Sequence, residues 1–398
     1  MADDRLRVLS HLDSPPDEVD TDRLRNALES AVGAVFRPGH RVTVLRNGDE
    51  IFPALLEAIK EAEHTIDFVT FVYWKGQIAR EFADALAERS LAGVRVRVVL
   101  DAFGSAPMKT SLIRRMAGAG VAVEKFRPTV RWKFWEADHR THRKILVVDN
   151  QVAFTGGVGI ASEWEGDARD SSEWRDTHFR IEGPTVLALK AAFLTDWRDT
   201  GHAIDVSDAR VETPDSPGGA DVALLDGSAQ IGFNDAERAL EAVVAAAEHR
   251  IVIQTPYFNP TDELIDLLQA ALARGVEVDV LVPGPHIDKR VSEVMATEMY
   301  QPLLRSGGRV WRYQPTMMHA KAVLVDGVLS IVGSLNINRR SVEKDEETAV
   351  GILDGDITSQ LERHFQEDVE RSEPASTEDS DGGRRLLAKL LKPISPEI

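Results

Sequence analysis

One short pattern occurs twice along the chain and constrains the fold more than any other feature. His142-x-Lys144-x4-Asp149 lies in THRKILVVD, and His319-x-Lys321-x4-Asp326 lies in MHAKAVLVD. Seven residues after each aspartate a pair of small residues begins, Gly156-Gly157 in one copy and Gly333-Ser334 in the other. A single His-x-Lys on a strand is usually a solvent-facing pair, but the duplication with matched small residues argues against that interpretation. Two identical chemical sets predict two homologous halves that share one active site.

The spacing predicts how the motif side chains are arranged. The apolar runs 145–148 and 322–325 predict strands, and residues two apart on a strand point to the same face. Each motif histidine therefore projects together with its lysine. An imidazole can attack or transfer a proton near neutral pH, and an ammonium group beside it supplies positive charge for a phosphate-like anion. The candidate catalytic residues are His142, Lys144, Asp149, His319, Lys321 and Asp326.

Two further parts of the motifs have a structural as well as a chemical interpretation. Asp149 and Asp326 come at the strand ends, where they are better placed to fix the following turn or to pair with a neighbour than to do chemistry. The small residues at Gly157 and Ser334 would let a backbone amide approach a phosphate oxygen closely.

The repeat continues outside the motifs. An amphipathic helix pattern over 51–62 leads through Glu63-His64 into a strand over 65–73, and the same succession returns as 236–247, Glu248-His249 and 250–257. Strand–helix–strand order with Val-rich strands predicts an α/β fold in which each half is a mixed, mostly parallel sheet flanked by helices. The predicted boundaries are an N-terminal extension (1–39), a first half (40–204), a linker (205–220), a second half (221–370), and an acidic tether with a short basic amphipathic tail (371–398).

Composition excludes several classes of protein. The 398 residues include no cysteine, which excludes disulfides, a thiol nucleophile and thiolate metal sites, and fits a reducing cytoplasmic location. The formal net charge of −18 disfavours a general nucleic-acid binder. We expect no signal peptide and no membrane span, so any membrane contact would be peripheral. The basic, apolar segment 384–392 could lie at a lipid surface or dock on the protein's own body.

The motifs and their flanks resemble the phospholipase D superfamily, and within it the bacterial cardiolipin synthases. The similarity covers roughly residues 40–370 and includes LDAFGS around Asp101, RTHRK around His142, WRDTHFRIEGP around Asp176 and QTPYFNP around Tyr257. Superfamily members carry an Asn two positions after the small pair; Asn336 matches it in the second copy, and Gly159 replaces it in the first. The usual RSF-x-LN-x-E ending reads RSVEKDEE over 340–347, which keeps the final acid and changes residues of the expected acceptor-side pocket.

The resemblance implies two facing halves about a pseudo-twofold axis and a covalent phosphohistidine mechanism that needs no metal and no other cofactor. It implies His142 as nucleophile and His319 as acid and base, with Asp176 and Glu347 orienting the imidazoles unless they are surface acids. The residues expected to hold the phosphate oxygens are Lys144, Lys321 and Asn336, with the amides near Gly157 and Ser334. The aromatic residues that line the cleft, or else belong to the core, are Tyr73, Trp74, Tyr257 and Phe258. A basic run attracts lipid headgroups or a nucleic-acid backbone, or is a solvated face: Lys125, Arg127, Arg131, Lys133, Arg140 and Arg143.

These implications give one leading function and three alternatives. We expect a phosphatidyltransferase that makes cardiolipin at the inner face of the cell membrane, with phosphatidylglycerol as substrate and phosphatidylethanolamine as a second candidate. The alternatives are a phospholipase D that releases phosphatidic acid, a metal-independent phosphodiesterase acting on nucleic acid, and a noncatalytic membrane-binding scaffold. Intact His-Lys pairs in both copies disfavour the scaffold, and the acidity of the chain disfavours the nuclease. We therefore expect phospholipids and a membrane surface as partners, and no nucleic acid.

Overall fold

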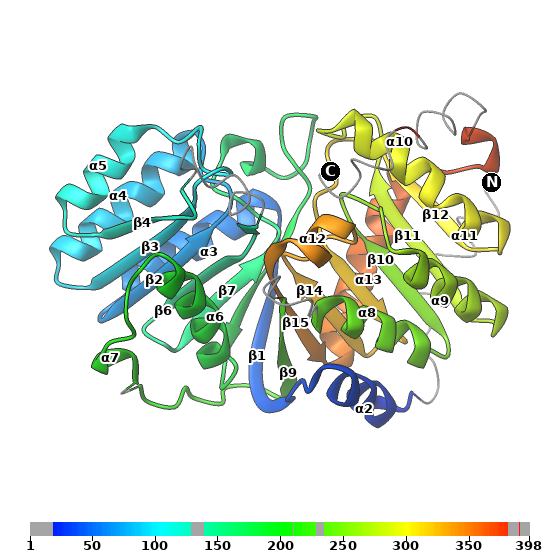
Figure 1. Cartoon of the computed structure of the whole chain (residues 1–398), viewed down its shortest axis with the longest axis horizontal. Helices are drawn as coiled ribbons and strands as arrows, with labels where there is room; N and C mark the ends of the chain where they lie inside the picture. Colours follow the sequence, from blue (N-terminus) through cyan, green and yellow to red (C-terminus); the bar gives the residue numbers. More distant parts are fainter. Residues whose placement is uncertain (1–18, 129–138, 210, 228–234, 381–389, 391–398) are drawn as a thin grey trace.

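Two halves with the same succession of elements lie side by side in the computed structural model (Figure 1), which describes residues 19–128, 139–209, 211–227, 235–380 and 390. The N-terminal extension contains α2 (Thr21–Val32). The first half contains β1 (Arg37–Arg46), α3 (Asn47–Glu61), β2 (Thr65–Thr70), α4 (Gln77–Leu91), β3 (Arg95–Asp101), α5 (Thr110–Gly118), β4 (Ala122–Phe126), β5 (Arg140–Thr141), β6 (Lys144–Val148), β7 (Val152–Gly156), the 3-10 helix η1 (Ser162–Trp164), β8 (Thr177–Glu182), α6 (Val186–Asp199) and α7 (Val206–Ala209). The second half contains β9 (Ala220–Gly227), α8 (Asp235–Ala246), β10 (Arg250–Gln254), α9 (Asp262–Ala273), β11 (Glu277–Pro283), α10 (Arg290–Met299), α11 (Gln301–Arg305), β12 (Arg309–Tyr313), β13 (Ala322–Val325), β14 (Leu329–Gly333), α12 (Arg339–Glu343), β15 (Asp345–Leu353), α13 (Gly355–Glu370), β16 (Ser372–Pro374) and the 3-10 helix η2 (Thr377–Asp379).

The strand order reveals the internal symmetry. The described strands form one 16-stranded sheet in the order β16-β12-β11-β10-β13-β14-β15-β9-β1-β8-β7-β6-β2-β3-β4, with β5 paired to β15. Apart from β16 and β5, the order reads the same from both ends when each strand is replaced by its counterpart in the other half. The two central strands, β1 and β9, are antiparallel neighbours, as a twofold axis between them requires. The predicted arrangement of two homologous halves about a pseudo-twofold axis is confirmed.

The sheet is mixed, but the predicted predominance of parallel pairs within each half is not observed. Parallel pairing is confined to β2–β3–β4 in the first half and β10–β11–β12 in the second, apart from the short β5–β15 pair. The motif strands β6 and β13 are antiparallel to both neighbours. Only residues 149–151 join β6 to β7, and a parallel return would need a crossover of about a dozen residues or more.

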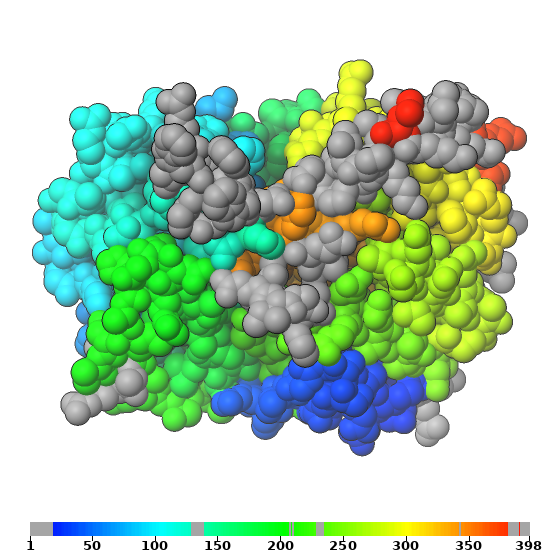
Figure 2. Space-filling view, in the orientation of Figure 1, coloured from blue at the N-terminus to red at the C-terminus, as the bar shows by residue number. Residues whose placement is uncertain are grey.

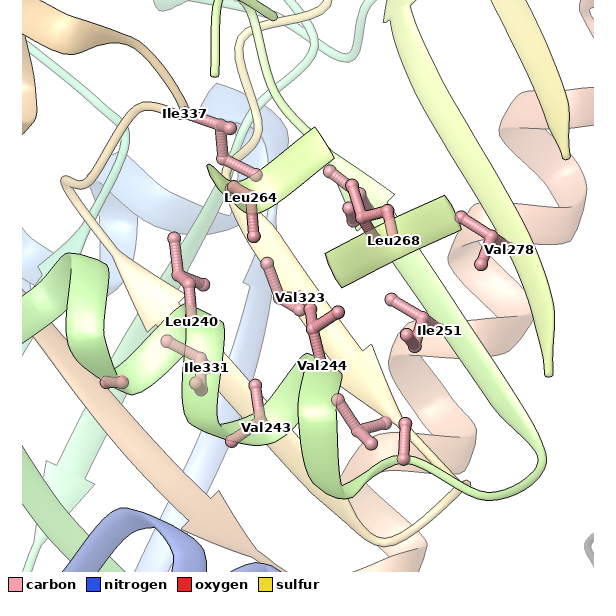
Figure 3. Close-up of a cluster of buried hydrophobic side chains, with 14 of the residues drawn as sticks. Leu240, Val243, Val244, Ile251, Leu264, Leu268, Val278, Val323, Ile331 and Ile337 are labelled. Atoms are coloured by element: carbon pink, nitrogen blue, oxygen red, sulfur yellow. The ribbon is translucent and has the colours of Figure 1, made fainter. Parts of the chain in front are cut away.

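Three hydrophobic cores hold the sheet and its helices together. In the first half, α3, α4 and α5 pack on the sheet. In the second half α8 and α9 do so, as the labelled side chains of Figure 3 show. The third core is shared between the halves, because α6 of the first and α13 of the second contribute to it together with strands from both. The helix predicted over 51–62 is α3 and that over 236–247 is α8. The strands predicted over 65–73 and 250–257 are β2 and β10, and each ends three residues before its predicted end.

The N-terminal extension is part of the packed structure. Helix α2, blue at the lower edge in Figure 2, lies against the second half, where Leu24 and Leu28 enter the core that contains α8. Arg23 on the same helix pairs with Glu248 and, at 3.1 Å, with Asp326 of the second motif. Helix α2 precedes the first half in the sequence but packs on the second half and stabilises it.

The predicted flexible tether is ordered in its described part. Residues 372–374 form β16 at the sheet edge, antiparallel to β12. Ser376 and Asp379 form a capping box around η2. Within the predicted acidic tether, residues 372–374 and 377–379 therefore have regular structure, because edge pairing and capping satisfy the backbone there. The basic segment 384–392 lies outside the described residues except for residue 390.

Candidate active site

The two motif strands begin at the seam between the halves, and each is attached to the opposite half by its main chain. The amide of His142 donates to the carbonyl of Glu346 at 2.9 Å, and the amide of His319 donates to the carbonyl of Arg175 at 2.7 Å. Next to the first contact, β5 pairs with the start of β15. These bonds fix the backbone of His142 relative to β15, and the backbone of His319 relative to the segment that precedes β8.

Both imidazoles face a carboxylate from the opposite half. Nδ1 of His142 lies 2.9 and 3.1 Å from the two carboxylate oxygens of Glu347. Nδ1 of His319 lies 2.7 Å from Oδ2 of Asp176. A carboxylate at Nδ1 sets the tautomer and leaves Nε2 for an incoming group. The structure thus brings together both residues that the sequence analysis selected as orienters.

The carboxylates are themselves held in place. Oδ2 of Asp176 accepts from the indole Nε1 of Trp164 at 2.8 Å, and Oδ1 accepts from the amide of Thr177 at 2.8 Å. Oε2 of Glu347 accepts from Oγ of Ser334. The sequence analysis does not identify Trp164, because it ends the three-residue 3-10 helix η1, which is too short to show a periodic pattern. It packs edge-on against His319, with ring centroids 5.2 Å apart.

The motif lysines are buried beside the histidines. Nζ of Lys144 donates to the carbonyl of His142 at 2.9 Å, and Nζ of Lys321 donates to the carbonyl of His319 at 2.6 Å. Burial lowers the pKa of Lys144 to about 8 and that of Lys321 to about 7, although nearby carboxylates oppose the shift. Both ammonium groups are therefore short of anionic partners, and a phosphate would supply one.

Burial also determines the charge state of the imidazoles. It lowers the pKa of His142 to about 4 and that of His319 to about 3, against the opposing effect of their carboxylates. Burial by itself would raise the pKa of Asp176 and Glu347, but the adjacent histidine and lysine hold both below the usual value. The empty site accordingly contains two neutral imidazoles and two carboxylates near pH 7.

The motif aspartates, named above among the candidate catalytic residues, lie at the ends of their strands outside the cavity lining, where they make structural bonds as their strand-end positions predict. The carboxylate of Asp149 accepts from the amides of Glu63, His64 and Thr65 at 2.7–2.8 Å. Asp326 accepts in the same way from residues 248–250 at 2.8–3.0 Å. These are the repeated Glu-His segments of the sequence, so each aspartate fixes the start of β2 or β10.

The small pairs also have a different role from the predicted one. The amide of Gly157 donates to the carbonyl of Thr177 at 3.2 Å, and that of Ser334 donates to the carbonyl of Thr348 at 2.8 Å, so both amides are already bonded within the sheet. A Cβ at position 157 would overlap the carboxylate of Asp176. The glycine therefore makes room for the orienting carboxylate, and Ser334 bonds to the other one.

A cavity of about 750 Å³ opens above the two histidines. Asn336 lies in its wall, buried, and its Oδ1 has no partner among the described residues. The counterpart position is Gly159, where an asparagine side chain would not fit, because a Cβ there would lie 2.6 Å from Cβ of Val72. Tyr257 lines the cavity and its hydroxyl bonds to Asp288 at 2.8 Å. The other lining residues include Phe71, Trp74, Phe103, Trp164, Trp174, Arg140, Lys144, Lys289, Asn338, Arg340, Ser341 and Asp345.

Not all of the predicted aromatic and basic residues reach this cavity. Tyr73 is buried in the core and donates to the carbonyl of Ala79, and Phe258 is buried in the core of the second half. Of the basic run, Arg140 lines the cavity, whereas the others described form internal bonds: Lys125 to Ser105, Arg127 to Asp199, Arg143 to Asp196 and Asp226. Arg131 and Lys133 lie outside the described residues. The basic run therefore does not form one continuous charged surface in the described part of the chain.

Two residues of the altered 340–347 segment form an ion pair in the cavity wall. Nε of Arg340 lies 3.2 Å from Oδ2 of Asp345. Burial raises the pKa of Asp345 to about 7, and the nearby Arg340 partly offsets this shift.

Within the described ranges, no group of three or more His, Cys, Asp or Glu side chains is arranged to hold a metal ion. In the same residues, no helix combines the length and apolar character needed to cross a bilayer.

The duplicated motif, its crossed carboxylates and the shared cavity define an enzyme of the phospholipase D kind. The family model described as "Cardiolipin synthase, PLD-like domain" matches residues 55–165 and 240–369, and the chain belongs to this family of phosphatidyltransferases. The chain is 31% identical to cardiolipin synthase 1 of Bacillus cereus over 366 residues, which are 89% of this chain and 72% of that protein. It is 32% identical to cardiolipin synthase A of Pseudomonas syringae over 89% of this chain and 75% of that protein. The fold matches the crystal structure of phosphatidylserine synthase from Haemophilus influenzae with a TM-score of 0.69 and 16% identity, over 94% of this chain and 98% of that one.

Proposed function

We propose that this enzyme transfers a phosphatidyl group from one phospholipid to a hydroxyl group of another, and makes cardiolipin when both are phosphatidylglycerol. The observation that carries the proposal is the pair of imidazoles in the lining of one cavity, each next to a carboxylate of the opposite half. Lys144 lines the same cavity, and the buried Lys321 bonds to the carbonyl of His319. Family membership supports the choice of phospholipids as substrates. We propose that the enzyme acts in the cytoplasm at the inner face of the cell membrane.

The proposed first step forms a covalent intermediate. Nε2 of His142 attacks phosphorus, the bond from phosphorus to the headgroup oxygen breaks, and the leaving alcohol takes a proton from His319. His142 is assigned as nucleophile on the family resemblance, because the two histidines have equivalent partners in the structure. For His319 to serve as the acid, it must gain a proton on substrate binding; the Asp176 carboxylate at its Nδ1 stabilises that charged form.

The second step returns the enzyme to its first state. His319 removes the proton from the hydroxyl of the acceptor lipid, whose oxygen attacks phosphorus and displaces His142. Lys144, Lys321 and the Nδ2 group of Asn336 would donate to the nonbridging oxygens through both steps and stabilise the charge that develops on them. If water attacks in place of the acceptor, the product is phosphatidic acid, so transfer and hydrolysis differ only in this second step.

A lipid assay tests the proposal directly. Purified protein and a His142→Ala control are incubated in EDTA with phosphatidylglycerol and phosphatidylethanolamine in mixed micelles, and the products are read by mass spectrometry. Cardiolipin formed only by the intact enzyme supports metal-independent transfer. Phosphatidic acid alone means a hydrolase, and unchanged lipids contradict both. Cleavage of DNA under the same conditions would favour the nuclease alternative.

A second measurement assigns the two histidines. The protein is quenched in acid-free denaturant during turnover of phosphatidylglycerol, digested, and the peptides are searched for a phosphatidyl adduct. The adduct is expected on the peptide that contains His142, and it should be lost when His142 is replaced by alanine. An adduct on the His319 peptide would reverse the assignment.

A further inference from the structure

An exposed aromatic side chain lies at the mouth of the cavity. Phe103 lines the cavity, yet 68% of its surface is exposed to solvent. Ala106 and Pro107 on the same loop, which follows β3, also line the cavity and are exposed. The apolar lining of the cavity therefore continues outward onto the surface of this loop.

The loop is fixed in a conformation that keeps Phe103 outside. Oδ1 of Asp101 accepts from the amides of Phe103 and Gly104, both at 2.8 Å. Nε1 of Trp74 donates to the carbonyl of Gly104 at 2.6 Å. A Cβ at position 104 would overlap the carbonyl oxygen of Phe71, so the backbone is packed closely on its inner side. These bonds fix the backbone of the loop and so the position from which the exposed Phe103 side chain projects.

The counterpart loop of the second half flanks the mouth on the other side and carries positive charge. It follows β11, the counterpart of β3, and its Lys289 lines the cavity. Lys289 is exposed at the end of this loop, and Arg290 and Val291, the first residues of α10, are exposed directly after it. Lys109 is exposed on the first loop. Asp288 on the loop of the second half is bonded to the hydroxyl of Tyr257, and Nζ of Lys289 lies 5.1 Å from the centroid of that ring. On a chain with a net charge of −18, the cations Lys109, Lys289 and Arg290 thus outnumber the single carboxylate Asp288 around this apolar opening.

We propose that the two loops, 103–109 and 285–291, form the surface with which the enzyme docks on a phospholipid bilayer. Phe103 enters the interfacial region, and Lys109, Lys289 and Arg290 face the lipid phosphates. The proposal rests on the proposed function, since a lipid phosphate must reach His142 and His319 through this opening. Docking at the mouth lets the acyl chains stay in the bilayer while the headgroup enters the cavity.

The absence of cysteine permits a site-specific test. A single cysteine is introduced by Phe103→Cys and labelled with a polarity-sensitive fluorophore, in a His142→Ala background that prevents lipid turnover. The matched control is Leu91→Cys: Leu91 is 75% exposed and ends α4, whereas β3 begins at Arg95 and leads to Phe103, so the two probes lie at opposite ends of that strand. With vesicles of phosphatidylglycerol and phosphatidylethanolamine, we expect a blue shift and increased emission at position 103 alone. No change at 103, or equal changes at both positions, would overturn the proposal.

Vesicle sedimentation provides a second, label-free measurement. Phe103→Asp should weaken binding about ten-fold or more, because a charge replaces an apolar group that enters the interface, while Leu91→Asp should leave it unchanged. Equal binding by the two variants contradicts the proposal. Cardiolipin formation by the unaltered enzyme in mixed micelles is measured in parallel, because it tests the proposed function independently of docking on a bilayer. Cardiolipin formation without a vesicle response at 103 rejects only the docking surface, and a response without phosphatidyl transfer rejects only the function.

Discussion

Nδ1 of His319 lies 2.7 Å from Oδ2 of Asp176, although 143 positions separate the two residues. The counterpart pair, His142 and Glu347, crosses the seam in the opposite direction at 2.9 Å. Each half thus supplies one imidazole and the carboxylate for the imidazole of the other half. Neither half has a complete imidazole–carboxylate pair of this kind by itself, so the packing of the two halves creates the site.

Replacing either carboxylate should reduce catalysis without unfolding the protein. We expect Asp176→Asn and Glu347→Gln each to lower kcat by about 10²–10⁴-fold, because the uncharged side chain neither fixes the tautomer nor stabilises an imidazolium. The rate of phosphatidyl transfer and the circular dichroism spectrum are the measurements. Asp84→Asn is the control, since Asp84 pairs with Arg115 at the surface. Activity within two-fold of the unaltered enzyme would show that the carboxylates are not needed.

Trp164 should act through Asp176. Trp164→Phe keeps an aromatic ring next to His319 and removes the indole donor to Asp176, so kcat should fall roughly ten-fold, in line with the loss of one hydrogen bond to a charged group. Trp174→Phe is the comparison, because its ring centroid lies 5.4 Å from that of His319. In pH–rate profiles, only Trp164→Phe should shift the acid limb. Equal shifts in both variants would indicate that packing, and not the hydrogen bond, matters.

The motif aspartates should matter for stability and little for the reaction rate. Asp149→Asn weakens the acceptor for three backbone amides, so we expect a loss of about 1–3 kcal/mol in the free energy of unfolding. Asparagine suits the left-handed backbone at this position, where φ is 51°, and therefore adds no strain. Chemical denaturation measures the stability, and kcat is measured on the folded protein. A collapse of kcat with unchanged stability would restore the catalytic assignment.

The lysines should set the alkaline limit of activity. Burial lowers the pKa of Lys321 to about 7 and that of Lys144 to about 8, so raising the pH through 7–8 removes positive charge from the empty site. The value of kcat/KM, which reports the free enzyme, should fall over this range. Lys321→Arg keeps its charge at every accessible pH and should move the decline upward, even if it lowers the maximum. A profile that stays flat to pH 9 in the unaltered enzyme would contradict this assignment.

A buried ion pair should contribute strongly to the attachment of the halves. The carboxylate of Asp368 on α13 accepts from Nε of Arg175 at 3.0 Å and lies 3.2 Å from Arg46, both in the first half. Asp368→Ala leaves a buried guanidinium without its carboxylate, and we expect a loss of about 3–5 kcal/mol in the free energy of unfolding. Glu370→Ala, exposed on the same helix, should change it by less than about 0.5 kcal/mol. Equal denaturation midpoints for the two variants would contradict the role.

The local features of the fold could be predicted from the sequence because they depend on short-range patterns. Periodicity located α3, β2, α8 and β10, and the repeated HxKx4D motif indicated two halves and one shared site. The direction of strand pairing was wrongly predicted, because the three-residue connection at Asp149 outweighs the strand–helix–strand pattern. A related limit applies to Asp149, which the sequence places among the candidate catalytic residues. The spacing shows that Asp149 follows a strand, but only the tertiary structure shows that this end of the strand lies outside the cavity lining.

What the sequence by itself determined is the chemistry available, two His-Lys pairs on two strands and candidate acids elsewhere. The tertiary structure alone decided which acid meets which histidine, that Gly157 makes room for Asp176, and that Trp164 completes that arrangement. The physical reason is that these contacts join residues far apart in the chain, across a seam formed when two sheets become one. Burial at that seam, and not residue type, lowers the pKa values of the histidines and lysines.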